Sequence, residues 1–227
     1  MNKIEELVRE QTKNENTGHG LDHAINVRRL ALEFSKNEKV NRKVIELASL
    51  LHDVDDYKII GKENAEKQLN AKSIMNKLKI DNDLQRQVLD IIKNMGYSNC
   101  LRGIRPKTME GKIVSDADMC EALGANAIIR TISYTLLNNN SRGIIFDKNI
   151  FPDGNIDYKK YTSETSIAIN HFFEKILKLP GLLMTESGKA EGEKRKKIVI
   201  DFLREFFREN YLEDWSNYLE IFIKNSL

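Results

Sequence analysis

The sequence predicts an all-α protein. Its 227 residues include only three prolines, and long stretches rich in Leu, Ile, Glu and Lys place apolar residues at the three-and-four spacing of a helix face. The alternation of apolar and polar residues that marks half-buried strands is scarce. We expect helices at residues 2–12, 21–37, 39–53, 62–78, 82–95, 111–138, 163–178 and 188–222.

The first two helices differ in what they carry. Stretch 2–12 mixes acidic and basic residues and lacks the apolar core of a signal peptide. The second helix opens at Gly18-His19-Gly20-Leu21-Asp22-His23, where the two glycines indicate a tight turn. One stripe of this helix then carries His23, Val27, Leu30, Ala31 and Phe34. The imidazole of His23 therefore lies at the start of a face that we expect to be buried.

The helix at 39–53 ends in a histidine followed by an aspartate. His52 continues an apolar stripe made of Val44, Leu47, Ala48 and Leu51, and Asp53 comes next. Adjacent residues on a helix are turned by about 100°, so the two side chains cannot both point straight into the core. Both can nevertheless bind one ion at the end of the helix. The pair is a candidate for metal ligands that needs further ligands.

The helix expected at 111–138 supplies another acid. It follows a polar and basic break at 96–108 that holds Arg102, Arg105 and Lys107. Asp118 lies on a stripe with Val114, Ala122, Ala125 and Ile129. A carboxylate on an apolar stripe costs several kcal/mol unless something compensates it, and a divalent cation would do so.

The last third of the chain carries turn signals and a long amphipathic helix. The segment 138–162 contains NNNSRG and FPDGN, and loops of such length are often lids or partly structured excursions. Pro180-Gly181 ends a helix, and Phe202, Phe206 and Phe207 belong to the final one. No break resembles a domain boundary, so we expect 1–227 to form a single domain.

Composition excludes several classes of function. With 36 basic and 34 acidic residues, a net charge of +2 gives no broad field for binding nucleic acid or an anionic membrane. Cys100 and Cys120 form neither a disulfide framework nor a CxxC zinc motif, which suits a reducing compartment. No apolar run approaches the roughly 20 residues that span a membrane. We expect a cytoplasmic protein without nucleic-acid or membrane partners, whose function resides in a site.

Two imidazoles and two carboxylates would offer a divalent ion mixed nitrogen and oxygen ligands, with positions left for water and substrate. Such an ion activates water and polarises phosphoryl oxygens, which suits hydrolysis of a phosphate ester or anhydride. The alternative is that each histidine is a hydrogen-bonded core residue and that His52-Asp53 only caps a helix. Spacing alone leaves both interpretations open.

At HGLDH, LLHDVDDYK and SDADMCEALGA the sequence resembles the HD-domain phosphohydrolase superfamily, whose members bind a divalent ion through an H…HD…D quartet in a helical bundle. The stretches NAIIRTISY, HFFEKILKLPGLLMTESGKA and FLREFFRE are similar to small bacterial members that cleave nucleotides. The resemblance covers most of 18–210. It implies an HD-domain bundle with a metal-ligand core at about 18–135, additional C-terminal helices at about 160–222, and a ligand quartet of His23, His52, Asp53 and Asp118.

The fourth ligand has two candidates, because Asp116 and Asp118 both lie on partly apolar helix faces. The superfamily pattern of Ala-Asp followed by two residues and an Asp or His favours Asp118, with Glu121 in the last place. Asp116 stays the alternative, or an acceptor that orients a ligand histidine. Superfamily members with two metals carry extra histidines that this chain lacks, so the resemblance implies one divalent ion. We expect manganese, with nickel, iron, cobalt, zinc or magnesium as alternatives.

The resemblance also implies residues that act on the substrate. Asp56 is a candidate for water activation, because similar alarmone hydrolases carry an acid at this offset from the HD pair, and Lys58 is a candidate phosphate contact. Arg130 lies about three turns beyond Asp118 and could bind phosphate or pair with Glu121. His19, four residues before His23, is a candidate substrate contact or a residue that supports a metal ligand. Each of these residues could equally be an ordinary surface residue.

The expected function is that of a metal-dependent phosphohydrolase acting on a small phosphorylated metabolite. A nucleotide is the first choice, cleaved as by a nucleoside triphosphate pyrophosphohydrolase. The alternatives are an alarmone hydrolase, a phosphodiesterase, or a non-catalytic helical module that senses a metal or nucleotide. Nothing in the sequence marks a partner protein, and a homodimer is left open.

Overall fold

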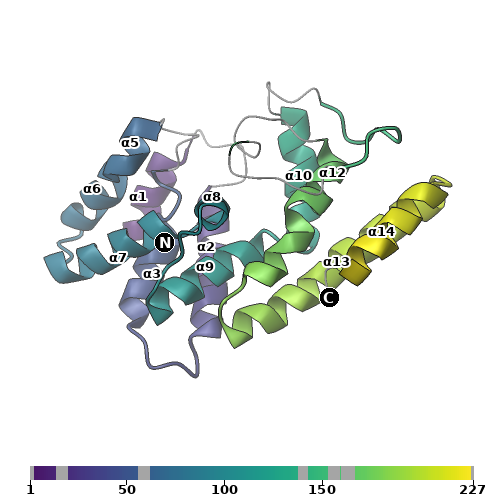
Figure 1. Ribbon diagram of the computed structural model, residues 1–227. Coiled ribbons are helices and arrows are strands. Elements are labelled where there is room, and N and C mark those ends of the chain that lie inside the picture. The colour runs from purple at the N-terminus through teal and green to yellow at the C-terminus, as the bar shows by residue number, and fades with distance from the viewer. Residues whose placement is uncertain are drawn as a thin grey trace. The chain divides into compact units, whose positions relative to one another are not determined.

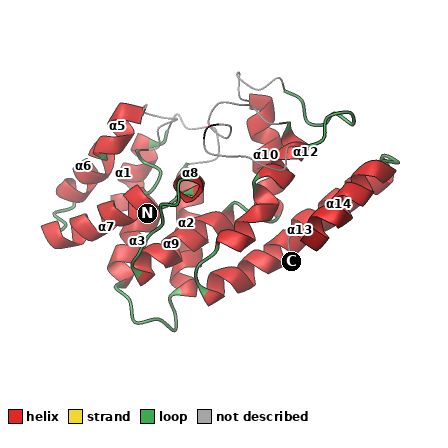
Figure 2. Cartoon of the chain, in the orientation of Figure 1, coloured by secondary structure: helices red, strands yellow, loops and turns green. Residues whose placement is uncertain are grey.

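The computed structural model describes residues 3–13, 20–55, 62–137, 143–152, 159 and 167–225 (Figure 1). Within these ranges the regular structure is helical and includes no strand, as Figure 2 shows, so the prediction of an all-α fold is confirmed. The elements are α1 (Lys3–Gln11), α2 (Leu21–Phe34), α3 (Arg42–Leu51), α5 (Lys62–Lys67), α6 (Leu69–Lys77), α7 (Asn82–Asn94), α8 (Tyr97–Leu101), α9 (Met109–Glu121), α10 (Ala125–Leu137), α12 (Ala168–Glu174), the 3₁₀ helix η1 (Ile176–Leu182), α13 (Glu186–Glu209) and α14 (Glu213–Asn225).

The chain groups into two compact units. The first comprises Met1–Glu121 and Met184–Gly188, and the second comprises Ala122–Leu183 and Lys189–Leu227. The first unit therefore contains the helices from α1 to α9 and the first turn of α13. The single domain that the sequence indicates stays a prediction.

The core of the first unit is built around α3. This helix packs on α2, α7 and α9, and α2 also packs on α9. Its N-terminus is capped by Asn41, whose side chain accepts hydrogen bonds from the backbone N–H groups of Lys43 and Val44. The apolar stripe predicted for α3 is confirmed, because all four of its members are buried: Val44, Leu47, Ala48 and Leu51.

Three of the predicted helices are divided by residues in the left-handed backbone region. The breaks lie at Gln68 (φ 50°), Gly124 (φ 72°) and Tyr211 (φ 56°). A left-handed residue ends a right-handed helix, and glycine is the usual residue there. The stripe expected to run on from Asp118 is therefore interrupted, and Ile129 beyond the break is 66% exposed. The break predicted at 96–108 contains the short helix α8.

The second unit has an aromatic core. Phe173, Phe207 and Trp215 are almost fully buried. The indole N–H of Trp215 donates a hydrogen bond to the carbonyl of Lys148 at 3.0 Å, and Phe151 stacks on the indole ring with 4.4 Å between ring centroids. The described part of the long loop predicted at 138–162 therefore packs on this core.

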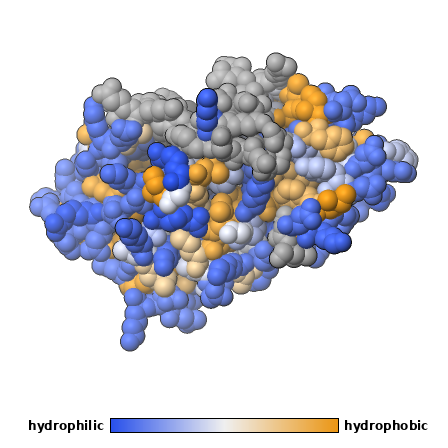
Figure 3. All heavy atoms as spheres, in the orientation of Figure 1, coloured by the Kyte–Doolittle hydropathy of each residue, from blue (hydrophilic) through white to orange (hydrophobic). Residues whose placement is uncertain are grey.

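The face of the molecule in Figure 3 is predominantly polar. Hydrophilic residues cover much of the face shown in Figure 3, with smaller hydrophobic areas between them. Across the described helices, none combines the length and the apolar character needed to cross a lipid bilayer.

Candidate metal centre

Two histidines from different helices meet in the first unit. His23 is the third residue of α2, and His52 directly follows the last residue of α3. Their Nε2 atoms lie 3.1 Å apart. Both side chains are only 4% exposed. The packing of α2 on α3 thus brings together two imidazoles that are 29 positions apart in the sequence.

The hydrogen bonds of the other ring nitrogens determine the tautomers. Nδ1 of His52 lies 2.9 Å from the carbonyl oxygen of Ser49, and Nδ1 of His23 lies 2.7 Å from Oε2 of Glu121. A carbonyl or an ionised carboxylate only accepts, so each Nδ1 carries the hydrogen. In the neutral rings both Nε2 lone pairs then point at the same place. Two lone pairs at this distance repel each other unless a proton or a metal ion lies between them.

Two carboxylates approach the same place. Oδ2 of Asp53 lies 3.4 Å from Nε2 of His23 and 3.2 Å from Nε2 of His52. Oδ1 of Asp118 lies 3.3 Å and 3.7 Å from the same two nitrogens. The carboxylates are more exposed than the imidazoles, at 14% for Asp53 and 22% for Asp118. The carboxylate side of the centre is therefore its more exposed side.

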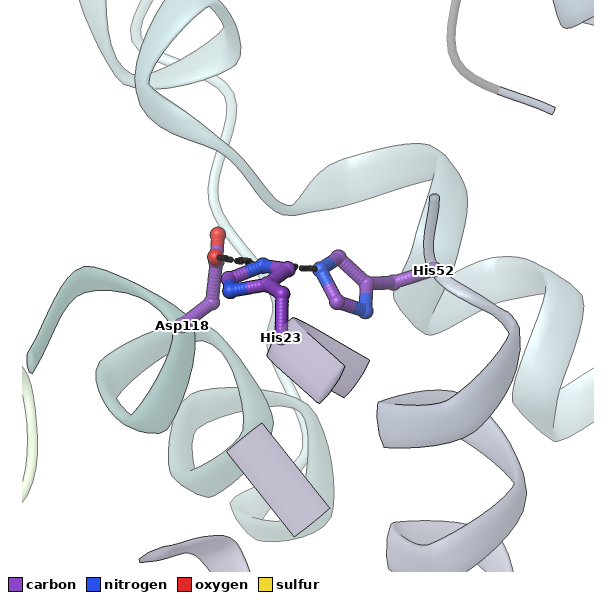
Figure 4. A group of neighbouring side chains, drawn as sticks. All are labelled: His23, His52 and Asp118. Atoms are coloured by element: carbon purple, nitrogen blue, oxygen red, sulfur yellow. Dashed lines mark hydrogen bonds and ion pairs between the residues drawn. The ribbon is translucent and has the colours of Figure 1, made fainter. Parts of the chain in front are cut away.

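The separations among Nε2 of His23, Nε2 of His52 and Oδ1 of Asp118 fit the coordination shell of one divalent ion. Among the described residues, these three side chains have ligand atoms within 4.8 Å of one another, a group that does not include Asp53. Ligand atoms about 2.1 Å from an ion are about 3.0 Å apart at right angles and about 3.4 Å apart at tetrahedral angles. Figure 4 shows three of the side chains pointing toward one another, with Asp118 and His52 on either side of His23. A set of two imidazoles and two carboxylates suits manganese, iron, cobalt, nickel or zinc, and leaves positions for water.

The pKa values reflect the concentration of negative charge. Burial lowers the pKa of His23, but hydrogen bonds with Asp118 and Glu121 and the charge of Asp53 raise it to about 10. Burial also lowers the pKa of His52, but the charge of Asp53, its hydrogen bond and the charge of Asp118 together raise it, so the net shift is upward. A site that favours the imidazolium so strongly favours positive charge, and a divalent ion supplies it.

The carboxylate of Asp116 makes its hydrogen bonds outside the histidine group. It is fully buried, and its carboxylate accepts hydrogen bonds from the backbone N–H of Met184 at 2.9 Å and of Thr185 at 2.6 Å, and from the Thr185 hydroxyl at 2.7 Å. It therefore joins α9 to the segment before α13. Of the two candidates for the fourth ligand, Asp118 is the one whose carboxylate lies beside the histidines, and Asp116 orients neither ring.

Asp55 holds the end of the HD segment in place. Its buried carboxylate accepts hydrogen bonds from the backbone N–H groups of Asn70 at 2.9 Å and Ala71 at 2.8 Å. These N–H groups belong to the first turn of α6, where a helix lacks internal acceptors. The Asn70 side chain donates back to the carbonyl of Val54 at 2.9 Å. The backbone just after Asp53 is therefore attached to a second helix.

The structure does not test the remaining predicted residues. His19, Asp56 and Lys58 lie outside the described residues. Arg130 is a half-buried residue of α10, which belongs to the second unit. Their roles at the site stay predictions.

Two groups at the centre were not assigned a role from the sequence. Glu121 is three residues after Asp118, so the spacing of neighbours on one helix face could have indicated that it shares the site. The carbonyl of Ser49 is three residues before His52, in the last turn of α3, where carbonyls lack an intrahelical donor. Both groups bind the outward nitrogen of a ligand histidine, which fixes the ring orientation.

Comparison with known proteins identifies relatives of the whole chain. The family model of the HD domain matches residues 20–123. The crystal structure of an HD-superfamily hydrolase from Bacillus thuringiensis is similar over 91% of this chain and 94% of that one, with 30% identity and a TM-score of 0.68. A structure from Lactobacillus plantarum covers the same shares with 29% identity and a TM-score of 0.77.

The protein YpgQ of Bacillus subtilis is also similar. It is 26% identical over 201 residues, which are 86% of each protein. Its crystal structure in complex with ADP matches 90% of this chain and 97% of that one, with 23% identity and a TM-score of 0.65. At this identity the structural match demonstrates a common fold.

Proposed function

Because the chain belongs to the HD superfamily and is a metal-dependent hydrolase, we propose that it cleaves a phosphoanhydride or phosphoester bond of a nucleotide. The observation that carries this proposal is the convergence of two Nε2 lone pairs and two carboxylate oxygens on one place. A nucleoside triphosphate, cleaved to release pyrophosphate, is the first candidate substrate. The ADP complex of the similar protein YpgQ supports a nucleotide over other phosphorylated metabolites.

Each side chain has a defined task in this proposal. His23, His52, Asp53 and Asp118 hold the ion, and Glu121 and the Ser49 carbonyl keep the two rings in the tautomer that presents Nε2. When bound, the ion supplies a water of lowered pKa and polarises the phosphoryl oxygen, with manganese as the first candidate. The greater exposure of the two carboxylates leaves the substrate an approach on their side.

The proposal assigns further roles on the strength of the sequence resemblance. Asp56 accepts a proton from the attacking water, and Lys58 binds the phosphoryl oxygens. Arg130 and His19 contact the substrate beyond the reacting phosphate. We place the protein in the cytoplasm, which suits Cys100 and Cys120, both free thiols. A homodimer is compatible with the proposal and is not required by it.

The test is a chromatographic screen of products. Chelator-treated protein is incubated with and without manganese and with nucleoside tri-, di- and monophosphates, cyclic nucleotides and alarmones. We expect cleavage that requires the metal and releases pyrophosphate from triphosphates, and we expect Asp53→Ala to abolish it. Cleavage of alarmones or cyclic nucleotides alone would replace the proposed substrate with one of these. The proposal fails if the protein binds the metal and turns over none of these compounds.

A further inference from the structure

A second group of charged side chains lies in the first unit, in the basic segment that the metal centre does not use. Arg105, Lys107 and Lys112 line a hollow of about 590 Å³. The other lining residues are Asn94, Gly103, Ile104 and Pro106, so the described lining includes no acidic residue. A volume of this size is typical of sites for small molecules.

One wall of the hollow is fixed to the end of α7. The side-chain amide of Asn99 on α8 donates hydrogen bonds to the carbonyls of Lys93 at 3.0 Å and Met95 at 2.7 Å. The carbonyl of Asn99 in turn accepts from the N–H of Ile104 at 2.9 Å. These three hydrogen bonds attach α8 to the end of α7 on one side and to the start of the basic segment on the other.

The other wall is fixed to the start of α9. A Cβ added to Gly111 would lie 2.7 Å from Cβ of Pro106 and 3.3 Å from Cγ1 of Ile91, so the chain packs closely there. The Thr108 hydroxyl caps α9 by accepting from the N–H of Gly111 at 3.1 Å. The hollow is thus a fixed part of the fold, and binding there would require little ordering of the backbone.

Arg105 lies near the start of α9, the helix that carries Asp118. Burial raises the pKa of the Cys100 thiol and that of the buried Asp116, two residues before Asp118. The charge of Arg105 lowers both pKa values, in each case by less than burial raises them. For the Cys100 thiol, the charge of Asp118 acts in the same direction as burial and raises the pKa. Lys112 lies on α9 six residues before Asp118, which is about 9 Å along the helix axis.

Three cationic side chains around one hollow suit an anion with several charges. Arginine and lysine bind phosphate oxygens through charge-assisted hydrogen bonds. Along the axis of α9, the rise of about 9 Å between Lys112 and Asp118, which are turned by about 120° from each other, is comparable to the length of a short chain of linked phosphates. A nucleotide with one phosphate at the metal centre would have further phosphates to place nearby.

We propose that Arg105, Lys107 and Lys112 form a subsite for the phosphate groups of the substrate that are not attacked. In this arrangement Arg105 contacts the phosphate nearer the reacting one, and the two lysines contact the phosphates farther away. This inference rests on the proposed function and extends it, because such a subsite selects a polyphosphate over a monophosphate.

The first test is binding of inorganic tripolyphosphate to the full-length, chelator-treated chain, measured by calorimetry. We expect Lys107→Ala/Lys112→Ala to weaken binding by about tenfold or more, since two charge-assisted contacts are lost. The matched control is Lys43→Ala/Lys77→Ala, which removes the same charge from two exposed lysines outside the hollow. Equal weakening in both variants would overturn the proposal, because it would reflect net charge alone, and so would no weakening in either.

The second test is kinetic and uses the manganese-loaded chain. For a nucleoside triphosphate we expect Lys107→Ala/Lys112→Ala to raise KM by about tenfold or more, with most of the loss in kcat/KM coming from KM. For p-nitrophenyl phosphate, which carries one phosphate, we expect a change below about twofold. An unchanged KM for the triphosphate would overturn the subsite while leaving the hydrolase intact. Absence of turnover by the wild type would instead overturn the proposed function, and the tripolyphosphate titration alone would then decide whether the hollow binds polyphosphate.

Discussion

Glu121 Oε2 accepts a hydrogen bond from Nδ1 of His23 at 2.7 Å, although the two residues are 98 positions apart in the sequence. The carboxylate lies at the end of α9 and is almost fully buried. By holding the hydrogen on Nδ1, it leaves the Nε2 lone pair free to bind an ion, and it raises the basicity of that nitrogen. The same helix thus carries a predicted ligand, Asp118, and the residue that orients the predicted ligand His23.

Glu121→Gln is expected to weaken metal binding by about 10-fold to 100-fold, because a neutral amide oxygen holds the imidazole less strongly. The measurement is the dissociation constant for manganese by calorimetry, with thermal unfolding of the metal-free protein to show that the fold persists. Glu33→Gln is the matched control, because Glu33 is exposed and pairs only with Lys36 in the described structure. Equal metal affinity in wild type and Glu121→Gln would show that the hydrogen bond does not tune the site.

The two acids of α9 are expected to respond differently to the same substitution. Asp118→Asn should lose most of the bound metal and retain the fold, since the side chain is 22% exposed and lies beside the histidines. Asp116→Asn should retain the metal and lose about 1–3 kcal/mol of unfolding free energy, because a buried acceptor of several hydrogen bonds is disturbed. Metal content by mass spectrometry and urea unfolding separate the two effects. If Asp116→Asn empties the site and Asp118→Asn does not, the fourth ligand is Asp116.

Helical spacing in the sequence predicted part of this arrangement. The buried stripe of α3 could be identified because its four members recur at helical intervals and all face the core. Asp116 and Asp118 could not be separated in the same way. They are turned by about 200° on the helix, yet α9 has packing partners on several sides, so both faces carry apolar residues. Only the contacts of α9 with its neighbours tell the two acids apart.

The breaks between helices were harder to predict than the helices. Gln68 and Tyr211 adopt positive φ although neither is glycine, so the residue type at these two positions does not indicate a helix break. Gly124 does give a sign, but a glycine inside a helix costs only about 1 kcal/mol, and a longer helix was a reasonable expectation. The hydrogen bond from His23 to Glu121 belongs to the same class of unpredicted features. It depends on which acid the folded chain brings to the ring.

Gly188 is expected to tolerate no larger residue, because it lies against the Asp116 carboxylate. A Cβ there would approach Cβ of Asp116 to 2.9 Å and the Thr185 hydroxyl to 2.8 Å. Gly188→Ala should therefore lower the unfolding free energy by about 1–3 kcal/mol through overpacking. Gly181→Ala is the control, since a Cβ at that position has no neighbour within 4 Å. Similar urea midpoints for the two variants would contradict this account of the Asp116 contacts.

The stability of the metal-free protein is expected to depend on the protonation of His23. Its pKa rises from 6.5 to about 10 on folding, so protonation stabilises the folded chain. The contribution is fully present below about pH 6.5 and is lost as the pH rises through about 10. We expect the Tm of the metal-free wild type to fall over this range and that of His23→Gln to fall less. Parallel Tm curves for the two proteins would contradict the prediction.

Metal binding is expected to have the opposite pH dependence. A histidine binds an ion only through a neutral nitrogen, so an ion entering the centre below about pH 10 must displace a proton from His23. Apparent affinity should therefore rise by about tenfold for each pH unit between about pH 7 and 9, or more steeply where His52, whose pKa is also raised, releases a second proton. Calorimetry in buffers of different ionisation enthalpy measures the number of protons released. A flat affinity with no proton release would mean that the ion binds without displacing a proton from either histidine.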